Sequence, residues 1–481
     1  MTQRWRPRPG DVVVRRPRLA QLRPVIVPVP LTLPKVPSQR LASPLTVVYG
    51  FLLLVLVGTG LLLLPWANHT GQPTPFMTAL FTAASAATVT GLTVVDTATY
   101  WTPFGQGVLW ALILVGGLGW MTLATFLLLV LGQRLSLPHQ LAMQQPLGLQ
   151  QVGRVIQVMQ RTVLTFLAIQ VVGSLLLVWR FRELLPDAPW PTVVWQGLFH
   201  GVSAFNNAGF AILPHSRNLE RLTLDLPSLV IVMALIIAGG LSYPVLEDLV
   251  RVRRWGRLAL DTKMVLVASL VLWIAGALVV LGFEYAHPTT LGSLPVWGKG
   301  VNALFFSVSA RTAGFTTVDF QGMAQATFFF IVALMFIGTA SASTGGGIRI
   351  NTLGVLVATV VASLRGQQYV NAFGREIPAP VVYRAMAVAS LGLAIVFVAA
   401  FLLTFIEKHG DFLRFLFEVV SAFGTVGLST GVTPDLSVAG KMVIILTMLV
   451  GRLGPLGLAL ALVPRERPAA LRFAAEPVRI A

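Results

Sequence analysis

Long apolar stretches alternate with short ones along most of this chain. Several of the long stretches have no charged residue, and these include Leu45–Trp66, Leu226–Leu246, Met264–Phe283, Gln321–Ile348 and Ala385–Ile406. Each is about long enough for a helix that crosses a ~30 Å hydrocarbon core at about 1.5 Å per residue. The short stretches are rich in small residues and have the length of half-membrane helices. The pattern predicts a multi-pass membrane protein made of helices.

Each short stretch ends in a glycine-centred motif, and the four motifs are TVTGL (88–92), NNAGF (206–210), RTAGF (311–315) and TVGLS (425–429). Their glycines, Gly91, Gly209, Gly314 and Gly427, lie 105 to 118 positions apart. Each motif lies between two long apolar stretches, so the repeating unit is long helix, short helix, glycine turn, long helix. Four units predict eight membrane-spanning helices and four pore loops. The expected fold is an all-α membrane protein of four tandem repeats around a pseudo-fourfold pore.

The repeats divide the chain into six segments. A basic, proline-rich tail precedes the repeats and a short tail follows them, with boundaries at 1–44, 45–132, 160–252, 262–364, 381–463 and 464–481. Lys and Arg concentrate in both tails and in the linkers between repeats, which places these parts in the cytoplasm under the positive-inside rule. The net charge of +17 is therefore explained by the basic residues that set the topology and lie near membrane lipid. No nucleic-acid partner is expected.

The four glycine motifs predict a cation filter. Non-helical backbone at membrane depth is tolerated where it lines a watery cavity, and carbonyl oxygens facing a common axis can replace the hydration shell of a cation. Glycine accepts positive φ and leaves room for this close approach. The aligned filter positions are Thr88, Val89, Thr90, Gly91, Asn206, Asn207, Ala208, Gly209, Arg311, Thr312, Ala313, Gly314, Gly424, Thr425, Val426 and Gly427. None is a carboxylate, which favours a monovalent over a divalent cation.

A small, polar segment, GTASASTGGGIRIN (338–351), interrupts the second long helix of the third repeat. Three consecutive glycines each cost about 1 kcal/mol in a helix interior relative to alanine, so the helix should break just below the filter. The residues expected to obstruct the pore are Ser341, Ser343, Thr344, Gly345, Gly346 and Gly347, together with Arg452 from the last span. A simple kink, and an arginine that only bonds backbone carbonyls, remain as alternatives.

Arg311 is an unexpected residue in a cation filter, because a cation facing the ion path would repel the substrate. Its side chain is therefore expected to point away from the path and to act as a structural brace, with Glu418 or Glu284 as candidate partners. The motifs GGLG (116–119) and AGGLSYP (238–244) in two second helices predict close helix packing beside the pore.

The four filter motifs, in the contexts TVTGL, NNAGF, SARTAGFTT and FGTVGLSTG, closely resemble those of the Trk/Ktr/HKT superfamily of potassium transporters. The resemblance covers about residues 45 to 463 and is strongest to KtrB-type membrane subunits. It implies K⁺ uptake, often Na⁺-stimulated, across the bacterial inner membrane. It also implies a homodimer on a cytosolic ring of nucleotide-binding (RCK-type, KtrA-like) subunits, a gate at the loop within 338–351, and a pore-lining role for Arg452.

Other classes of function find less support in the residues. Only 11% of the chain is charged, against about 25% in soluble domains. No paired carboxylates, metal cluster or nucleophile with its base occur at membrane depth, so we expect neither a catalytic site nor a cofactor in this chain. A secondary transporter of another monovalent cation or small solute, coupled to H⁺ or Na⁺, remains the alternative, although such coupling usually employs buried carboxylates.

Overall fold

The computed structural model describes residues 44–119, 155–214, 216, 218–318, 322–408 and 410–454. Within these residues loops and turns join the helices, and the assigned strands form one two-stranded hairpin, which confirms the all-α prediction. Most of both tails, and the ends predicted for the second helices of the first and fourth repeats (120–132 and 455–463), lie outside the described residues.

Each predicted repeat contains a first helix, a short helix and a second helix, with an additional four-residue helix in the first repeat and a second helix divided in two in the second and third repeats. The first contains α1 (Pro44–Leu62), α2 (Phe76–Ala87), α3 (Thr97–Tyr100) and α4 (Pro103–Leu118), and the second contains α7 (Val155–Leu184), α8 (Trp190–Phe205), α9 (Leu226–Gly240) and α10 (Tyr243–Val252). The third contains α11 (Leu260–Glu284), α12 (Val296–Ser309), α13 (Gln325–Phe336) and α14 (Ile350–Leu364), and the fourth contains α15 (Ala379–Ile406), α16 (Phe412–Gly424) and α17 (Val438–Leu453).

Short elements join these helices. They are the helical turns Pro65–Ala67, Glu220–Leu222, Trp255–Arg257, Pro288–Gly292 and Thr433–Asp435, and the strands β1 (Asn371–Ala372) and β2 (Arg375–Glu376). The strands pair antiparallel, Asn371 with Glu376 and Ala372 with Arg375, and form a hairpin between α14 and α15.

The helices differ in length and in burial according to their place in the repeat. Among the described residues three helices are long and apolar enough to cross a membrane, namely Gln160–Leu184 within α7, α11 and α15, and the bent pair α9 and α10 makes a fourth if it is counted as one span. Large apolar side chains of α15, such as Phe397, Phe401 and Phe405, are exposed, as is expected of a surface that faces lipid. The short helices α2, α8, α12 and α16 are instead buried along most of their length. The short helices therefore form the centre of the molecule.

Two apolar runs predicted as spans are broken. The run Leu226–Leu246 is helical only to Gly240, and α10 then continues at 101° to α9. Pro244 lies in the first turn of α10, where its missing N–H is tolerated at a helix start but not within a continuous helix. Of the run Gln321–Ile348, the described residues from 322 onward are helical from Gln325 to Phe336, after which a loop leads to α14. The break in the third repeat was predicted, whereas the bend after α9 was not.

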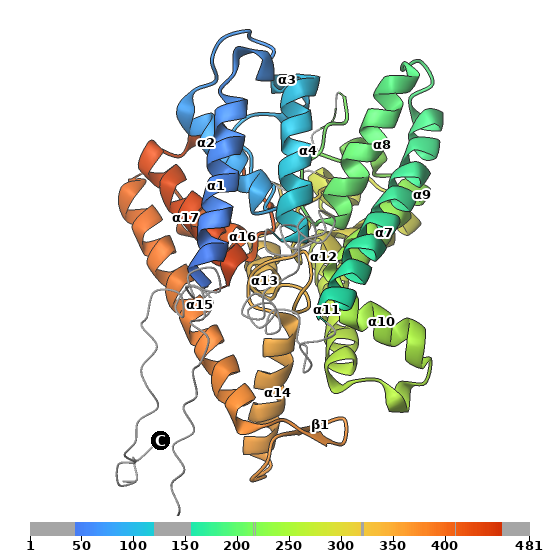
Figure 1. The fold of residues 1–481 in the computed structure, drawn as a ribbon, viewed down its shortest axis with the longest axis vertical. Helices are drawn as coiled ribbons and strands as arrows, with labels where there is room; N and C mark the ends of the chain where they lie inside the picture. Colours follow the sequence, from blue (N-terminus) through green and yellow to red (C-terminus); the bar gives the residue numbers. More distant parts are fainter. Residues whose placement is uncertain are drawn as a thin grey trace, which may run out of the picture. The chain divides into compact units, whose positions relative to one another are not determined.

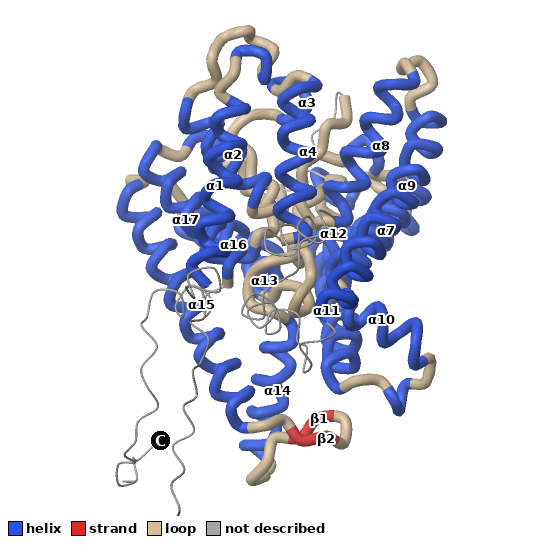
Figure 2. Tube along the Cα trace, in the orientation of Figure 1, coloured by secondary structure: helices blue, strands red, loops and turns tan. Residues whose placement is uncertain are grey.

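Consecutive repeats join into a closed ring. The second helix of each repeat packs on the short helix of the next, in the pairs α4–α8, α9–α12, α13–α16 and α17–α2. The last pair brings the red C-terminal helices beside the blue N-terminal repeat in Figure 1. Loop segments gather between the helices at the centre, where Figure 2 draws them in tan. The ring places the four ends of the short helices around one region.

In the first, second and fourth repeats, a glycine sets the distance between the second helix and its own short helix. A Cβ at Gly116, Gly239 or Gly451 would lie 2.0, 1.7 or 2.0 Å from the carbonyl oxygens of Ala87, Phe205 and Phe423, respectively. Contacts this short leave no space for any side chain larger than hydrogen. Close packing predicted from the GGLG and AGGLSYP motifs is therefore confirmed.

Gly116→Ala should destabilise the fold, because the new methyl group would collide with backbone that cannot shift cheaply. We expect a loss of at least about 1 kcal/mol, seen as a lower melting temperature of the purified protein in detergent. Gly107→Ala, in the same helix, is the matched control, since nothing lies within 4 Å of its added methyl group. Equal melting temperatures of the two variants would contradict the packing.

Candidate cation filter and the loop beneath it

The four motif glycines contact one another in a ring. A Cβ added at Gly91 would lie 2.4 Å from the carbonyl oxygen of Ala208, directly before Gly209. The same contact recurs from Gly209 to Ala313 (2.8 Å), from Gly314 to Val426 (2.1 Å) and from Gly427 to Thr90 (2.1 Å). Each glycine therefore lies against the carbonyl before the next repeat's glycine, in the order one, two, three, four and back to one. The four filter segments meet around a shared axis.

The backbone of the four segments takes positive φ at the same two positions. All four glycines have positive φ, at 91°, 70°, 72° and 92°, as their predicted role required. The residue two positions earlier is also left-handed in every repeat, and these residues are Val89, Asn207, Thr312 and Thr425. Side chains other than Asn rarely adopt this conformation, which costs about 1–2 kcal/mol per residue. The surrounding structure must therefore impose the same strained turn four times.

A serine at the end of each short helix holds this turn, a feature that was not predicted. The Ser85 and Ser421 hydroxyls accept from the amides of Gly91 (3.0 Å) and Gly427 (3.1 Å). In the other two repeats the hydroxyl donates to the carbonyl after the filter glycine, from Ser203 to Phe210 (2.7 Å) and from Ser309 to Phe315 (2.6 Å). The recurring Ser-Ala pair before each motif was the sequence signal for it.

An open cavity of about 360 Å³ lies on one side of the ring, and all four filter glycines line it. Asp96 and Glu220 also line it, and no Lys or Arg does so among the described residues. The other filter residues are buried, with only Gly91 and Gly427 partly exposed. The cavity is therefore a vestibule whose floor is the glycine ring and whose charged groups favour cations.

The glycine loop, residues 338–349, lies on the other side of the ring. Its base is closed by two backbone hydrogen bonds, from Gly338 N to Ile348 O (2.8 Å) and from Ile350 N to Thr339 O (3.0 Å). The last two residues of the predicted gating segment, Ile350 and Asn351, belong to α14 instead. Their inclusion was wrong because the third glycine ends the run of small residues, and helix resumes soon after it.

The tip of the glycine loop touches three of the four filter segments. Asn207 Nδ2 donates to Thr344 Oγ1 at 3.2 Å. A Cβ at Gly345 would lie 2.7 Å from Thr312 Oγ1, and one at Gly346 would lie 2.4 Å from Thr425 Oγ1. The glycines are therefore needed for the loop to approach the filter this closely.

Three buried oxygens at this boundary have no hydrogen-bond partner in the structure: Asn207 Oδ1, Thr312 Oγ1 and Thr425 Oγ1. They come from the same position of the second, third and fourth filter segments. Buried polar atoms are normally paired, so such a set indicates a place for water or an ion. The underside of the ring is thus polar and uncharged.

Three arginines donate to carbonyl oxygens of the glycine loop. Arg452 in α17 donates to Thr344 O and, across the loop, to Gly116 O and Gly117 O of α4. Arg349, at the end of the loop, donates to Gly345 O. Arg311, in the third filter segment, donates to Gly338 O at 2.9 Å. Positive charge is therefore gathered around the loop rather than on the ring of filter carbonyls.

Comparison with known proteins identifies the architecture. The TrkH family, described as cation transport protein, matches residues 43–468. The chain belongs to the TrkH family of cation transport proteins. The solved structure of the potassium transporter TrkH from Vibrio parahaemolyticus is similar with a TM-score of 0.69 and 18% sequence identity, covering 90% of this chain and 86% of that one. This likeness confirms the membrane fold of tandem repeats around a pore.

Curated relatives match along nearly their whole length. The Ktr system potassium uptake protein B of Bacillus subtilis is 41% identical over 417 residues, which cover 87% of this chain and 92% of that protein. The potassium/sodium uptake protein NtpJ of Enterococcus hirae is 35% identical over 438 residues, covering 90% of this chain and 96% of that one.

Neither candidate partner of Arg311 in this TrkH-family chain is correct. Glu418 accepts instead from Ser429, Thr430 and Thr433, and Glu284 accepts from Thr290, Ala324 and Thr327. Both carboxylates are fully buried. Glu418 braces residues after α16, whereas Glu284 braces Thr290, which precedes α12, and the start of α13. Hydroxyl and amide donors from these neighbouring segments supply the bonds that Arg311 was expected to supply. The Arg311 side chain does point toward α11 and the loop, away from the ring, as predicted.

Glu418→Gln should weaken the brace after the fourth filter segment. Glu418 accepts from Thr430 N at 2.8 Å and from three hydroxyls at 2.6–3.0 Å. Glutamine replaces one acceptor oxygen by an NH₂ group, whose two N–H donors would face the donors that the carboxylate now accepts from. We expect a loss of about 1–3 kcal/mol, measured as a lower melting temperature and lower K⁺ uptake. Glu376→Gln, on the exposed hairpin, should leave both unchanged; a Glu418→Gln variant indistinguishable from it would refute the brace.

Proposed function

We propose that this chain is a potassium uptake protein of the bacterial inner membrane. One observation carries the proposal: the four filter glycines, each against the carbonyl before the next, close a ring that floors a vestibule. The sixteen filter positions are those named from the sequence, and K⁺ is taken to bind their backbone carbonyls. The names of the relatives from Bacillus subtilis and Enterococcus hirae, which describe potassium uptake, support this choice of ion.

The chemistry of the ring suits a monovalent cation that must leave quickly. Carbonyl dipoles can replace the hydration shell of K⁺ at modest energetic cost, whereas a divalent cation usually requires carboxylates. The short helices add to this preference, since their C-terminal ends, which carry partial negative charge, lead directly into the ring. Inward flow would draw on the membrane potential, about 2.3 kcal/mol per charge per 100 mV.

The glycine loop serves as the gate in this proposal. It lies against three filter segments on the side opposite the vestibule, and Arg452 links it to α4. A loop held by hydrogen bonds rather than by a large apolar core can be displaced at low cost. Arg452 adds a positive charge near the exit, which raises the barrier to cations while the loop is in place. Ser341, Ser343, Thr344, Gly345, Gly346 and Gly347 form the obstructing part.

Assembly and regulation extend the proposal. Two copies of the chain are expected to form a homodimer, with both termini in the cytoplasm. A ring of cytosolic nucleotide-binding (RCK-type, KtrA-like) subunits would control the gate from that side. The name of the Bacillus subtilis relative, a protein of a Ktr system, supports a multi-subunit assembly. Stimulation by Na⁺ is a further expectation, and the name of the Enterococcus hirae relative, a potassium/sodium uptake protein, mentions both ions.

Uptake assays test the proposal. Expression in a bacterium that lacks its own K⁺ uptake systems should restore growth at low K⁺. Purified chain in liposomes should carry ⁸⁶Rb⁺ inward when the interior is negative, and excess K⁺ outside should compete with it more strongly than Na⁺. Transport of another cation, with no competition by K⁺, would overturn the assignment.

A further inference from the structure

The third repeat lacks a packing contact that the other three share. Gly116, Gly239 and Gly451 each lie against a carbonyl at the end of their own short helix. Gly338 takes the corresponding place in the third repeat, since it follows Gly314 by 24 positions as Gly451 follows Gly427. Its Cβ would instead lie 2.0 Å from Gly346 O, within the glycine loop. The helix α13 has ended by Phe336, so the base of the loop occupies the place of a packed helix.

In the third repeat, a hydrogen bond from Arg311 takes the place of the missing glycine-to-carbonyl contact. The third filter segment is one residue shorter than the others, since Ser309 precedes Gly314 by five positions where Ser85 precedes Gly91 by six. Arg311 therefore follows the Ser-Ala pair as Ala87, Phe205 and Phe423 do in the other repeats. Its guanidinium Nη2 donates to Gly338 O at 2.9 Å, in a fully buried position. A hydrogen bond replaces the glycine-to-carbonyl packing.

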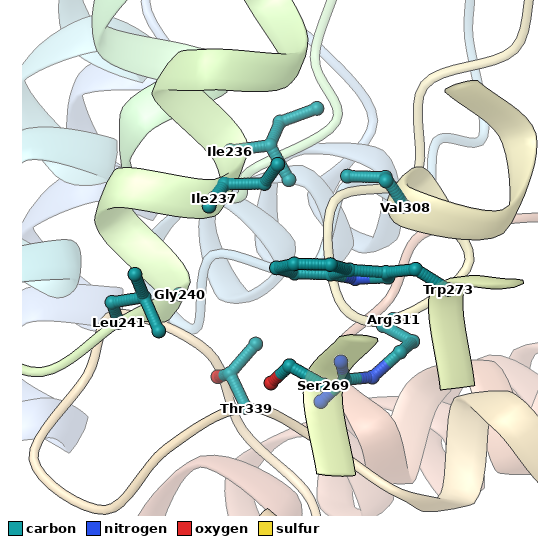
Figure 3. Close-up of a pocket in the computed structure, with 9 residues that line it drawn as sticks. All are labelled: Ile236, Ile237, Gly240, Leu241, Ser269, Trp273, Val308, Arg311 and Thr339. Carbon is teal, nitrogen blue, oxygen red and sulfur yellow. The ribbon is translucent and has the colours of Figure 1, made fainter. Parts of the chain in front are cut away.

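The surroundings of Arg311 leave its charge otherwise uncompensated. Figure 3 shows the guanidinium beside the flat Trp273 ring, with the Ser269 hydroxyl nearby, and its central carbon lies 5.8 Å from the ring centroid. Among the described residues no carboxylate lies within ion-pair distance, and Nε has no partner. The adjoining cavity, about 10 Å³, has the size of one water molecule and cannot hold a hydrated counter-ion.

These observations describe a connection between the third filter segment and the glycine loop that breaks when the loop moves. The residue is 2% exposed and directly precedes Thr312, the left-handed filter residue that the loop tip also approaches. A buried cation without a carboxylate depends strongly on the few groups that do solvate it, namely the loop carbonyl, the Trp273 face and the end of α12. Displacing the glycine loop would therefore remove a main contact of Arg311 and alter the conformation of Thr312.

We propose that Arg311 is a positioning residue that couples the third filter segment to the base of the glycine loop. The proposal rests on the proposed function, because it deepens the gating role of that loop. It makes ion selectivity depend on whether the gate is closed, through a hydrogen bond that only the loop-bearing repeat contains. Arg311 does not contact the ion in this scheme.

The test combines Arg311→Gln with the deletion of Ser341–Gly347 in a double-mutant cycle. ⁸⁶Rb⁺ uptake and its competition by K⁺ and Na⁺ are measured in liposomes for the wild type, each variant and the combination. Arg311→Gln alone should lower the preference for K⁺ over Na⁺ by about threefold or more and raise the uptake rate. In the deleted background it should change either quantity by less than about twofold, because the tip of the loop, whose position Arg311 couples to the filter through Gly338 O, is then absent.

Two further variants keep the test decisive. Arg311→Lys retains a cation and a donor, so it should recover a large part of the selectivity that Gln removes, even if Arg311→Gln yields little folded protein. Arg414→Gln changes an exposed arginine of α16 and should leave selectivity unchanged. Equal effects of Arg311→Gln with and without the loop would overturn the coupling. The proposed function would survive that result, because it depends on K⁺-selective uptake by the wild type.

Discussion

Replacing Gly314 by serine should abolish most of the discrimination between K⁺ and Na⁺. The glycine has φ +72°, and a Cβ there would lie 2.1 Å from Val426 O. The side chain must displace a carbonyl of the neighbouring filter segment, so the ring can no longer fit a dehydrated K⁺. We expect the K⁺/Na⁺ preference in ⁸⁶Rb⁺ competition assays to fall at least about tenfold, which corresponds to about 1.4 kcal/mol.

Two companion variants distinguish the ring from general damage. Gly91→Ser should act in the same direction, because its Cβ would lie 2.4 Å from Ala208 O on another side of the ring. Gly300→Ser, in the short helix that leads to Gly314, has open space around the new side chain and should retain wild-type selectivity. If both ring variants kept the wild-type preference for K⁺ over Na⁺, the assignment of these glycines to the selectivity filter would be wrong.

Deleting Ser341–Gly347 should raise the rate of K⁺ uptake about tenfold, equivalent to about 1.4 kcal/mol off the barrier. The deleted residues include those that touch Asn207, Thr312 and Thr425. Their removal also eliminates the Thr344 carbonyl that accepts from Arg452. The closed base of the loop, formed by Gly338 with Ile348 and by Thr339 with Ile350, should allow the chain to rejoin.

The rate is measured as initial ⁸⁶Rb⁺ uptake into liposomes at equal protein content, with the melting temperature as the check that the variant is folded. A folded deletion variant with unchanged or slower uptake would show that the loop does not obstruct the pore. The loop would then be a kink that relieves strain in the broken helix, the alternative that the sequence left open.

Local patterns explain why much of the site was predictable from the sequence. The positive φ of Gly91, Gly209, Gly314 and Gly427 follows from their spacing and from the short apolar stretch before each one. Helix breaking by three consecutive glycines is likewise a local property of Gly345, Gly346 and Gly347. Internal repetition strengthened the first inference, since each filter glycine recurs at the equivalent place in every repeat.

Features that depend on distant contacts were not predictable. Hydropathy does not register the bend after Gly240, because Ser242 and Pro244 barely change the apolar average of the run. Arg311 was assigned a carboxylate, yet it bonds a backbone carbonyl, which carries no side-chain signature. Glu418 and Glu284 were already occupied by hydroxyl and amide donors from segments folded against them. The errors about Arg311 and the two carboxylates arose where the decisive partner was backbone or a small polar group.

The most direct measurement locates the ion itself. Crystals of the protein grown in Rb⁺ or Tl⁺, with anomalous diffraction recorded at the absorption edge, would show where a K⁺ analogue binds. The account predicts an anomalous peak on the shared axis, enclosed by the carbonyl oxygens of Thr90, Ala208, Ala313 and Val426. Anomalous density found only away from that ring, with none between the four segments, would contradict it.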